Sequence, residues 1–203
     1  MKLYDGEKAP NPRRVRIFLT EKGIDIPLEP VDMGALGHKS AEISGLNPLQ
    51  RLPVLVLDDG TALSESVAIC RYLEELNPDP PLMGIDAKDR AIVEMWQRRM
   101  EMHLLLLVAN VFRHAHPAMK DWEVPQIKEF SEANRPKALA SMIWLNDELK
   151  DRPFIAGDRY TIADITAMVA MDFTKPARID VPEELENLRR WYGSVKARPS
   201  SDA

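Results

Sequence analysis

The run Ser64-Glu65-Ser66 stands directly before a stretch of helical periodicity and carries groups that could hold a small charged molecule. Unsatisfied amides and the helix dipole favour an anion at a helix N-terminus, so Ser66 is placed to receive a carboxylate. Glu65 beside it could pair with an ammonium group. Taken alone, however, the run favours ordinary N-capping of the helix by Ser64 or Ser66.

Three polar residues, His103, Asn110 and His114, recur at spacings of seven and four in the second half of the chain. On one long helix they would share a face, where His114 could hold a water molecule or a substrate. The alternative for His114 is a cation that interacts favourably with the dipole at the helix C-terminus. No His-Glu-x-x-His motif is present, and we therefore expect no metal site.

The single cysteine, Cys70, falls within a helical pattern, where a small buried packing residue is expected rather than a redox nucleophile. A lone cysteine cannot form an internal disulfide, and no Cys-x-x-Cys motif offers a thioredoxin-type redox couple. No secretory signal follows Met1. These features predict a reducing, cytoplasmic setting.

The composition favours a globular protein that acts on small molecules or proteins. The chain has 203 residues, of which 45% are hydrophobic and 29% charged, enough to bury a core without metal or disulfide support. Its formal net charge is -5, and no block of Lys or Arg is present, which argues against nucleic-acid and acidic-membrane surfaces. The longest aliphatic run, residues 104–109, is far shorter than the roughly 20 residues that span a bilayer.

Short apolar runs alternate with helical patterns in the first part of the chain. Strand, helix and strand come first, with Gly23 ending the helix, and an antiparallel hairpin around Asp58-Asp59-Gly60 and a second helix follow. The expected strands are residues 2–4, 28–31, 53–57 and 61–63, and the expected helices are residues 13–22 and 66–76.

The proline-rich segment 77–81 cannot continue the second helix, because proline lacks an amide donor. We therefore expect domains at residues 1–77 and 88–203, joined by a linker at 78–87. Helical periodicity alone continues beyond the linker, which predicts a helical bundle. Thr161 is the expected N-cap of one of its helices, with Asp164 in the first turn.

The order of these elements, together with Leu52-Pro53 at the start of the hairpin and Ser64-Glu65-Ser66 at the start of the next helix, resembles the cytosolic glutathione S-transferase superfamily. The resemblance runs through nearly the whole chain. It implies an α+β fold, with an N-terminal thioredoxin-like, glutathione-binding domain followed by an all-α helical bundle domain that carries the acceptor-substrate pocket. Its other pieces are Arg13-Arg14-Val15-Arg16-Ile17, Asn47-Pro48, residues 68–73 and residues 161–164.

The resemblance assigns a contact to each charged or polar group of glutathione. It implies that Pro53 is cis and that the main chain of Leu52 pairs with the cysteinyl unit. Ser66 would take the γ-glutamyl carboxylate and Glu65 the neighbouring ammonium. For the glycyl carboxylate the family places basic residues at the positions of His38, Lys39 and Arg51, although each could instead be a solvated surface charge.

The chain departs from the family where a Ser, Tyr or Cys usually stabilises the glutathione thiolate. Residues 9–12 read Ala-Pro-Asn-Pro and contain no hydroxyl or thiol, and Tyr4 lies too early in the first strand. Asn11 is the expected donor to the thiolate, favoured by resemblance over an ordinary turn residue. Arg13 and Arg14 either raise the local positive potential or lie over the surface.

The expected function is that of a glutathione transferase, which binds reduced glutathione as a co-substrate, stabilises its thiolate and transfers it to an electrophilic small molecule. Reduction of a peroxide or disulfide by the bound glutathione is one alternative, and a non-enzymatic binding protein on the same fold is another. The family also implies a homodimer. Several apolar side chains could line the acceptor pocket, although their helical spacing places most of them in the core. They are Met95, Met100, Met102, Leu105, Leu106 and Phe112.

Overall fold

The computed structural model describes all 203 residues, and these form two compact units. One unit contains Met1–Leu82 together with the C-terminal segment Pro199–Ala203, and the other contains Met83–Arg198. None of the helices combines the length and the apolar character needed to cross a membrane.

The first unit is built on a four-stranded mixed sheet with the order β2-β1-β3-β4. β1 pairs with β2 in parallel and with β3 antiparallel, and β3 pairs antiparallel with β4. All four expected strands are confirmed, with boundaries that differ by a few residues. The strands are β1 (Lys2–Asp5), β2 (Leu28–Pro30), β3 (Val54–Val56) and β4 (Ala62–Ser64).

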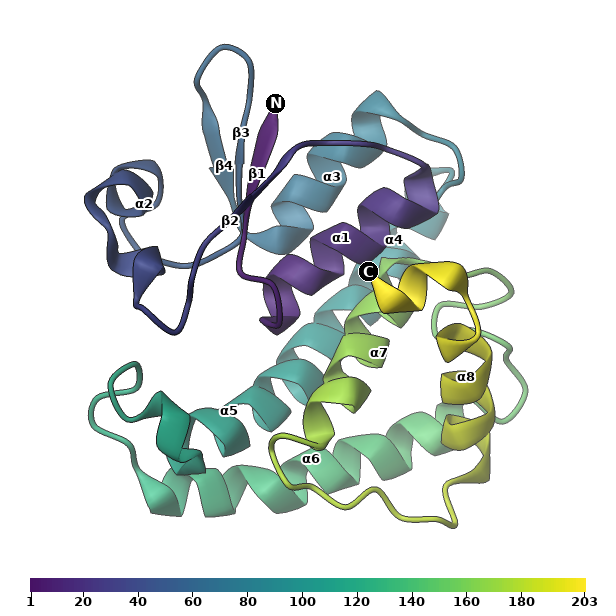
Figure 1. Ribbon diagram of the computed structural model, residues 1–203. Helices are drawn as coiled ribbons and strands as arrows, with labels where there is room; N and C mark the ends of the chain where they lie inside the picture. The colour runs from purple at the N-terminus through teal and green to yellow at the C-terminus, as the bar shows by residue number, and fades with distance from the viewer. The chain divides into compact units, whose positions relative to one another are not determined.

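Helices cover both faces of this sheet. α1 (Pro10–Lys22) and α3 (Ser66–Leu76) lie on one face, and the short α2 (Ala41–Leu46) lies on the other (Figure 1). α1 begins three residues earlier than expected, because proline fits the first turn of a helix, where an N–H has no intrahelical partner. It ends as expected at Gly23, whose φ of 64° is left-handed.

Alternation along the strands gives each face of the sheet its own core. Leu3 and Leu55 are opposite each other in the β1–β3 register and are fully buried, together with Phe18 of α1. Tyr4 and Val54 point the other way, where they pack with Ile43 and Leu52 in a second hydrophobic cluster. The unit also contains two short 3₁₀ helices, η1 (Gly37–Lys39) and η4 (Pro199–Asp202).

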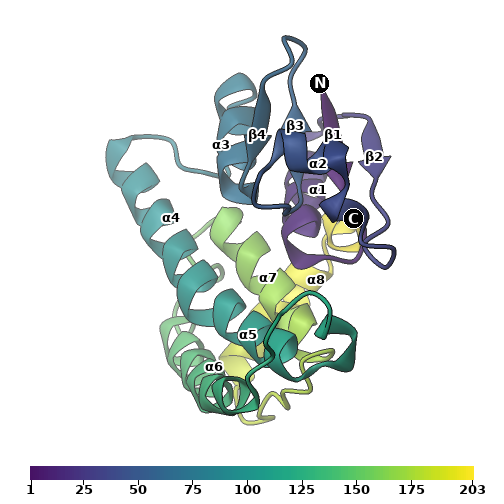
Figure 2. The same ribbon diagram turned by 90° about the vertical axis from the view of Figure 1, so that its left-hand side faces the viewer.

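The second unit is all helical, as expected. Its central helix is α7, in which every residue from Ile162 to Met171 is buried, and α5 and α6 pack against each other (Figures 1 and 2). Its elements are α4 (Ala87–Met100), the π-helical segment η2 (Glu101–Leu105), α5 (Leu106–Ala115), the 3₁₀ turn η3 (Pro117–Met119), α6 (Lys128–Glu148), α7 (Ile162–Thr174) and α8 (Glu186–Lys196).

The π-helical segment η2 interrupts the one long helix on which the sequence pattern placed His103, Asn110 and His114. The expected common face of His103, Asn110 and His114 assumed an uninterrupted α-helix, which the structure does not have. His103 lies inside the π-helical segment and is exposed, whereas Asn110 and His114 follow in α5 and are half-buried.

The buried carboxylate of Asp164 ties three separate parts of the second unit together. Thr161 is the N-cap of α7, as expected, and its N–H and hydroxyl both donate to Oδ2 of Asp164, at 2.9 and 3.1 Å. The other oxygen, Oδ1, accepts from the main-chain N–H of Ile155 at 2.9 Å and from Nε1 of Trp191 at 2.8 Å. The capping box thus also anchors the loop before it and α8.

We expect Asp164→Ala to lower the free energy of unfolding by about 3 kcal/mol or more. The change leaves three buried N–H donors without an acceptor, each at a cost of about 1–3 kcal/mol. Urea unfolding measures the loss. Asp158→Ala, which removes an exposed carboxylate from the same segment, is the matched control and should change stability by no more than about 0.5 kcal/mol.

The stability loss caused by Asp164→Ala should also depend on pH. Burial raises the pKa of Asp164 from 3.8 to about 6, and its hydrogen bonds limit the rise. The folded state therefore binds this proton more tightly than the unfolded chain, and the stabilisation from protonation is lost as the pH rises through about 6. The loss caused by Asp164→Ala should thus be larger near pH 5 than near pH 7.5. An equal loss at both values would contradict the raised pKa.

Candidate functional site

The peptide bond between Leu52 and Pro53 is cis, as the resemblance implied. It lies just before β3, where the N–H and C=O groups of Leu52 make no hydrogen bond within the chain. The buried side chain of Asn47 holds the loop that leads to it, because Nδ2 donates to the carbonyl of Arg51 at 2.9 Å and Oδ1 accepts from the N–H of Leu49 at 3.1 Å. The sequence marked Asn47 as part of a motif but did not predict this positioning role.

The N-terminus of α3 has no side-chain cap, so the expected alternative of ordinary capping by Ser64 or Ser66 is not observed. Ser66 is buried, yet its hydroxyl makes no hydrogen bond within the chain. Glu65 precedes it at the N-cap position with φ 69° and ψ 111°, a conformation that is unfavourable for a residue with a side chain. The first turn of α3 therefore presents donors without internal partners next to an exposed carboxylate.

Strand register brings these two motifs to the same end of the sheet. Val54 is paired with Ser64 in the β3–β4 ladder and with Tyr4 in the β1–β3 ladder. Leu52 precedes Val54 and Glu65 follows Ser64 on adjacent antiparallel strands, so the two lie beside each other. The main-chain groups of Leu52 and the start of α3 thus form one continuous polar edge.

The three basic residues expected for the glycyl carboxylate also gather in one place. His38 is buried, with 1% of its surface exposed. Burial lowers the pKa of His38, and the nearby charges of Lys39 and Arg51 lower it further. Lys39 and Arg51 are themselves exposed. The cluster therefore consists of two accessible cations around an imidazole that is neutral at neutral pH.

The loop between β1 and α1 runs against the Leu52 corner. A Cβ atom added at Gly6 would lie 3.3 Å from Cδ1 of Leu52, so a side chain there would press on that residue. This loop leads directly into α1, whose second residue is the half-buried Asn11. The hydroxyl of Tyr4 donates to the carboxylate of Glu42. The Tyr4 hydroxyl therefore already has a hydrogen-bond partner. Asn11 is the one polar side chain among residues 9–12 that could donate to a thiolate.

The two arginines near the start of α1, Arg13 and Arg14, have different surroundings. Arg13 donates to the carbonyl oxygens of Ser201 at 2.6 Å and Ala203 at 3.3 Å, which holds the C-terminal segment on α1. Arg14 is only 3% exposed, so the expectation that it lies over the surface is wrong. Its Nη2 atom donates to Oδ1 of Asn11 at 3.0 Å.

His114 has partners for both ring nitrogens within the second unit. Nδ1 accepts from the main-chain N–H of Ile127 at 3.1 Å, and Nε2 lies 3.7 Å from Oε1 of Glu123. The ring also meets Phe130 edge-on. These contacts connect the end of α5 to the start of α6, a structural role that the sequence did not predict because Glu123 and Ile127 lie in the intervening loop.

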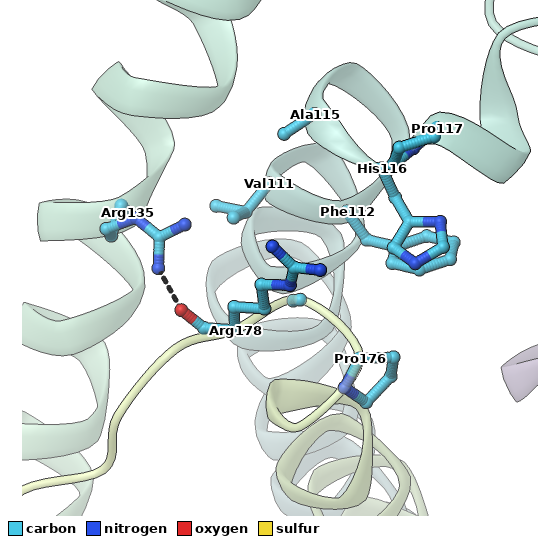
Figure 3. A pocket seen from close by; sticks show the side chains of 9 residues that line it. Val111, Phe112, Ala115, His116, Pro117, Arg135, Pro176 and Arg178 are labelled. Carbon is cyan, nitrogen blue, oxygen red and sulfur yellow. Dashed lines mark hydrogen bonds between the residues drawn. The ribbon is translucent and has the colours of Figure 1, made fainter.

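The apolar side chains suggested for an acceptor pocket are divided between core and surface. Met100 and Leu105 are buried, Met95, Met102 and Leu106 are exposed, and Phe112 is half-buried. Phe112 lines a hollow of about 190 Å³ at the ends of α5 and α7, where its ring stacks on that of His116 (Figure 3). Arg135 donates to the carbonyl of Arg178 at the rim of this hollow.

No group of three or more His, Cys, Asp or Glu side chains is arranged to hold a metal ion. The sole thiol, Cys70, is fully buried in α3, and burial raises its pKa to about 12. Nearly all of it is therefore protonated at neutral pH, a state that is poorly nucleophilic.

Comparison with known proteins identifies relatives along almost the entire chain. Residues 9–76 match the family model described as glutathione S-transferase, N-terminal domain, and residues 95–199 match glutathione S-transferase, C-terminal domain. Glutathione S-transferase 2 of Saccharomyces cerevisiae is 36% identical over 98% of this chain and 87% of its own length.

Solved structures agree with this comparison. A glutathione S-transferase domain-containing protein of Marinobacter aquaeolei VT8 matches with a TM-score of 0.95 and 39% identity, over 98% of this chain and 99% of that one. Gtt2 from Saccharomyces cerevisiae also gives a TM-score of 0.95, with 36% identity over 100% of this chain and 99% of that one.

Cys70 should resist alkylation in the folded protein. Because its thiol is buried and has a raised pKa, iodoacetamide at neutral pH should leave native protein unlabelled and label it fully in urea, as measured by intact mass. Rapid labelling of native protein, with the melting temperature unchanged, would contradict the packing role.

Proposed function

Because the chain belongs to the glutathione S-transferase family, we propose that it binds reduced glutathione in the first unit, favours the thiolate and transfers it to an electrophilic small molecule. The chain is an enzyme of that family. The observation that carries the proposal is the polar edge formed by Leu52 and the uncapped start of α3, whose donors have no partners within the chain.

Each end of the tripeptide has a complementary group on this edge. The γ-glutamyl carboxylate fits the hydroxyl of Ser66 and the first-turn amides of α3, where the dipole favours an anion. The ammonium fits the exposed carboxylate of Glu65. The strained backbone of Glu65 supports this assignment, because such strain concentrates where a side chain must be held in place for a ligand.

The middle and the other end of glutathione fit the Leu52 corner and the basic cluster. The free N–H and C=O of Leu52 could pair with the cysteinyl unit in the manner of a short added strand. The positive charges of Lys39 and Arg51 would attract the glycyl carboxylate. His38 is buried and its pKa is lowered, so we assign it a supporting contact rather than a charge.

Asn11 is the proposed donor to the thiolate. It stands in the first turn of α1, where the helix dipole lowers the pKa of a bound thiol, and its loop lies against Leu52, which would hold the cysteinyl unit. The alternative is that His114 stabilises the thiolate through a water molecule. Its contacts to Ile127 and Glu123 favour a structural role.

Reduction of a peroxide or disulfide is the second candidate reaction. The inert Cys70 favours a scheme in which all redox chemistry takes place on the sulfur of glutathione. Product analysis separates the two reactions, because conjugation yields a thioether whereas reduction yields oxidised glutathione.

Two variants separate glutathione binding from thiolate stabilisation. Glu65→Ala should weaken glutathione binding by about 1–3 kcal/mol, because it leaves the ammonium poorly satisfied. Asn11→Ala should instead raise the pKa of the bound thiol, measured by thiolate absorbance, and leave the dissociation constant nearly unchanged. Calorimetry measures the affinities. Absence of binding to the unmodified protein at millimolar glutathione would refute the proposed function, and a pKa that moves only in His114→Ala would replace Asn11 with the water-mediated mechanism.

We also propose a homodimer, which the family implies. Large apolar side chains are exposed on α3, α4 and η2, which we propose as the interface, and a stable interface of more than roughly 1,000 Å² would cover them. These are Leu76 in α3, Met95 in α4 and Met102 in η2, with exposures of 53%, 41% and 49%.

Light scattering across a dilution series should give twice the monomer mass of 23.0 kDa. Met102→Arg places a charge in the proposed interface and should shift the equilibrium towards monomer. Leu28→Arg, at an exposed position in β2 outside these segments, is the control. A particle of 23.0 kDa at every concentration that still binds glutathione would contradict the homodimer.

A further inference from the structure

Arg14 is a buried cation near the N-terminus of α1, the end of a helix where the dipole disfavours positive charge. Its side chain does not extend to water. It turns back instead, and Nη2 donates to the side-chain oxygen of Asn11 at 3.0 Å. A hydrogen bond of this kind between residues three apart in a helix couples the two side chains directly.

The chemistry of arginine fixes which way the Asn11 amide faces. A guanidinium has only donors, so the atom that faces it must be the carbonyl oxygen Oδ1 and not the nitrogen. The Nδ2 amino group, with its two donors, is then directed away from Arg14. Arg14 therefore selects the one amide orientation that leaves Asn11 acting as a hydrogen-bond donor.

The start of α1 has few other donors for an anion. Pro10 and Pro12 have no N–H, and the N–H of Arg13 donates to the carbonyl of Ala9 at 3.2 Å. The main-chain N–H of Asn11 and its side-chain amino group are therefore the principal donors of the first turn. If the Asn11 amide turned over, its amino group would be lost as one of these two donors. The ability of the first turn to bind an anion therefore depends strongly on the orientation of this amide.

We propose that Arg14 is a positioning residue that orients the amide of Asn11 so that Nδ2 donates to the glutathione thiolate. This inference rests on the proposed function, and it assigns Arg14 no contact with the ligand. The ionisable groups packed nearby on α3 are Cys70 and Glu74, and the charges of Arg14 and Glu74 act on the Cys70 thiol in opposite directions.

A double-mutant cycle on the full chain tests the proposal. The unmodified protein, Asn11→Ala, Arg14→Met and the double variant are compared by the pKa of bound glutathione, its dissociation constant and the melting temperature. Arg14→Met keeps an aliphatic chain in the core but removes the donor. It should raise the thiol pKa by about one unit, a tenfold change in the ionisation constant, with little change in affinity.

The double variant should show no further rise in thiol pKa beyond that of Asn11→Ala, because Arg14 acts through Asn11. Arg14→Lys keeps a donor, so it should raise the thiol pKa less than Arg14→Met does. Additive pKa shifts, or no shift in Arg14→Met, would overturn the positioning role. If Arg14→Met fails to fold, the pKa of bound glutathione is compared between Arg14→Lys and Arg14→Gln to test the positioning role.

A second measurement does not need glutathione and so separates this inference from the proposed function. The side-chain amide of Asn11 gives a pair of nitrogen-15 correlated proton resonances. In Arg14→Met that pair should move towards the averaged values of a mobile amide. An unchanged pair would overturn the inference whether or not glutathione binds. A changed pair without glutathione binding would refute the proposed function and leave only the orientation of Asn11 by Arg14 supported.

Discussion

The antiparallel pairing of β3 with both of its neighbours is the constraint on which the candidate site depends. Three pairs of residues join β3 to β1, and three more join it to β4. This register places the Leu52 corner beside Glu65. A shift by one residue would turn Tyr4 and Val54 out of their cluster with Ile43 and would separate Leu52 from the start of α3 at the same time. Burial of apolar side chains therefore fixes the alignment of polar groups that do not themselves stabilise the sheet.

Hydrogen-bond satisfaction differs sharply between the two units. Asp164 in the second unit accepts four hydrogen bonds and leaves the surrounding donors satisfied. The start of α3 in the first unit has no cap, and Glu65 before it has an unfavourable backbone conformation. The first arrangement favours stability and the second leaves groups available to a ligand. This contrast is typical of a protein whose binding edge is supported by rigid elements around it.

Local patterns in the sequence predicted the parts of the structure that local interactions decide. The strands, the end of α1 at Gly23 and the capping of α7 by Thr161 depend on neighbours within a few residues, and all are confirmed. α2 was not predicted, because six residues that include Ser44 and Gly45 carry little helical signal. The buried position of Arg14 was also missed, since burial of a cation depends on partners in the fold that no periodicity reveals.

The first unit is not a continuous piece of chain. Its last segment, Pro199–Ala203, follows the whole of the second unit in sequence, yet it is held on α1 by Arg13 and by the hydroxyl of Ser200, which donates to Glu21. On the ribosome, α1 is therefore made long before the residues that cover it. The first unit can acquire its full set of contacts only after translation has passed through the helical unit, so a nascent chain stalled earlier would carry an incompletely covered α1.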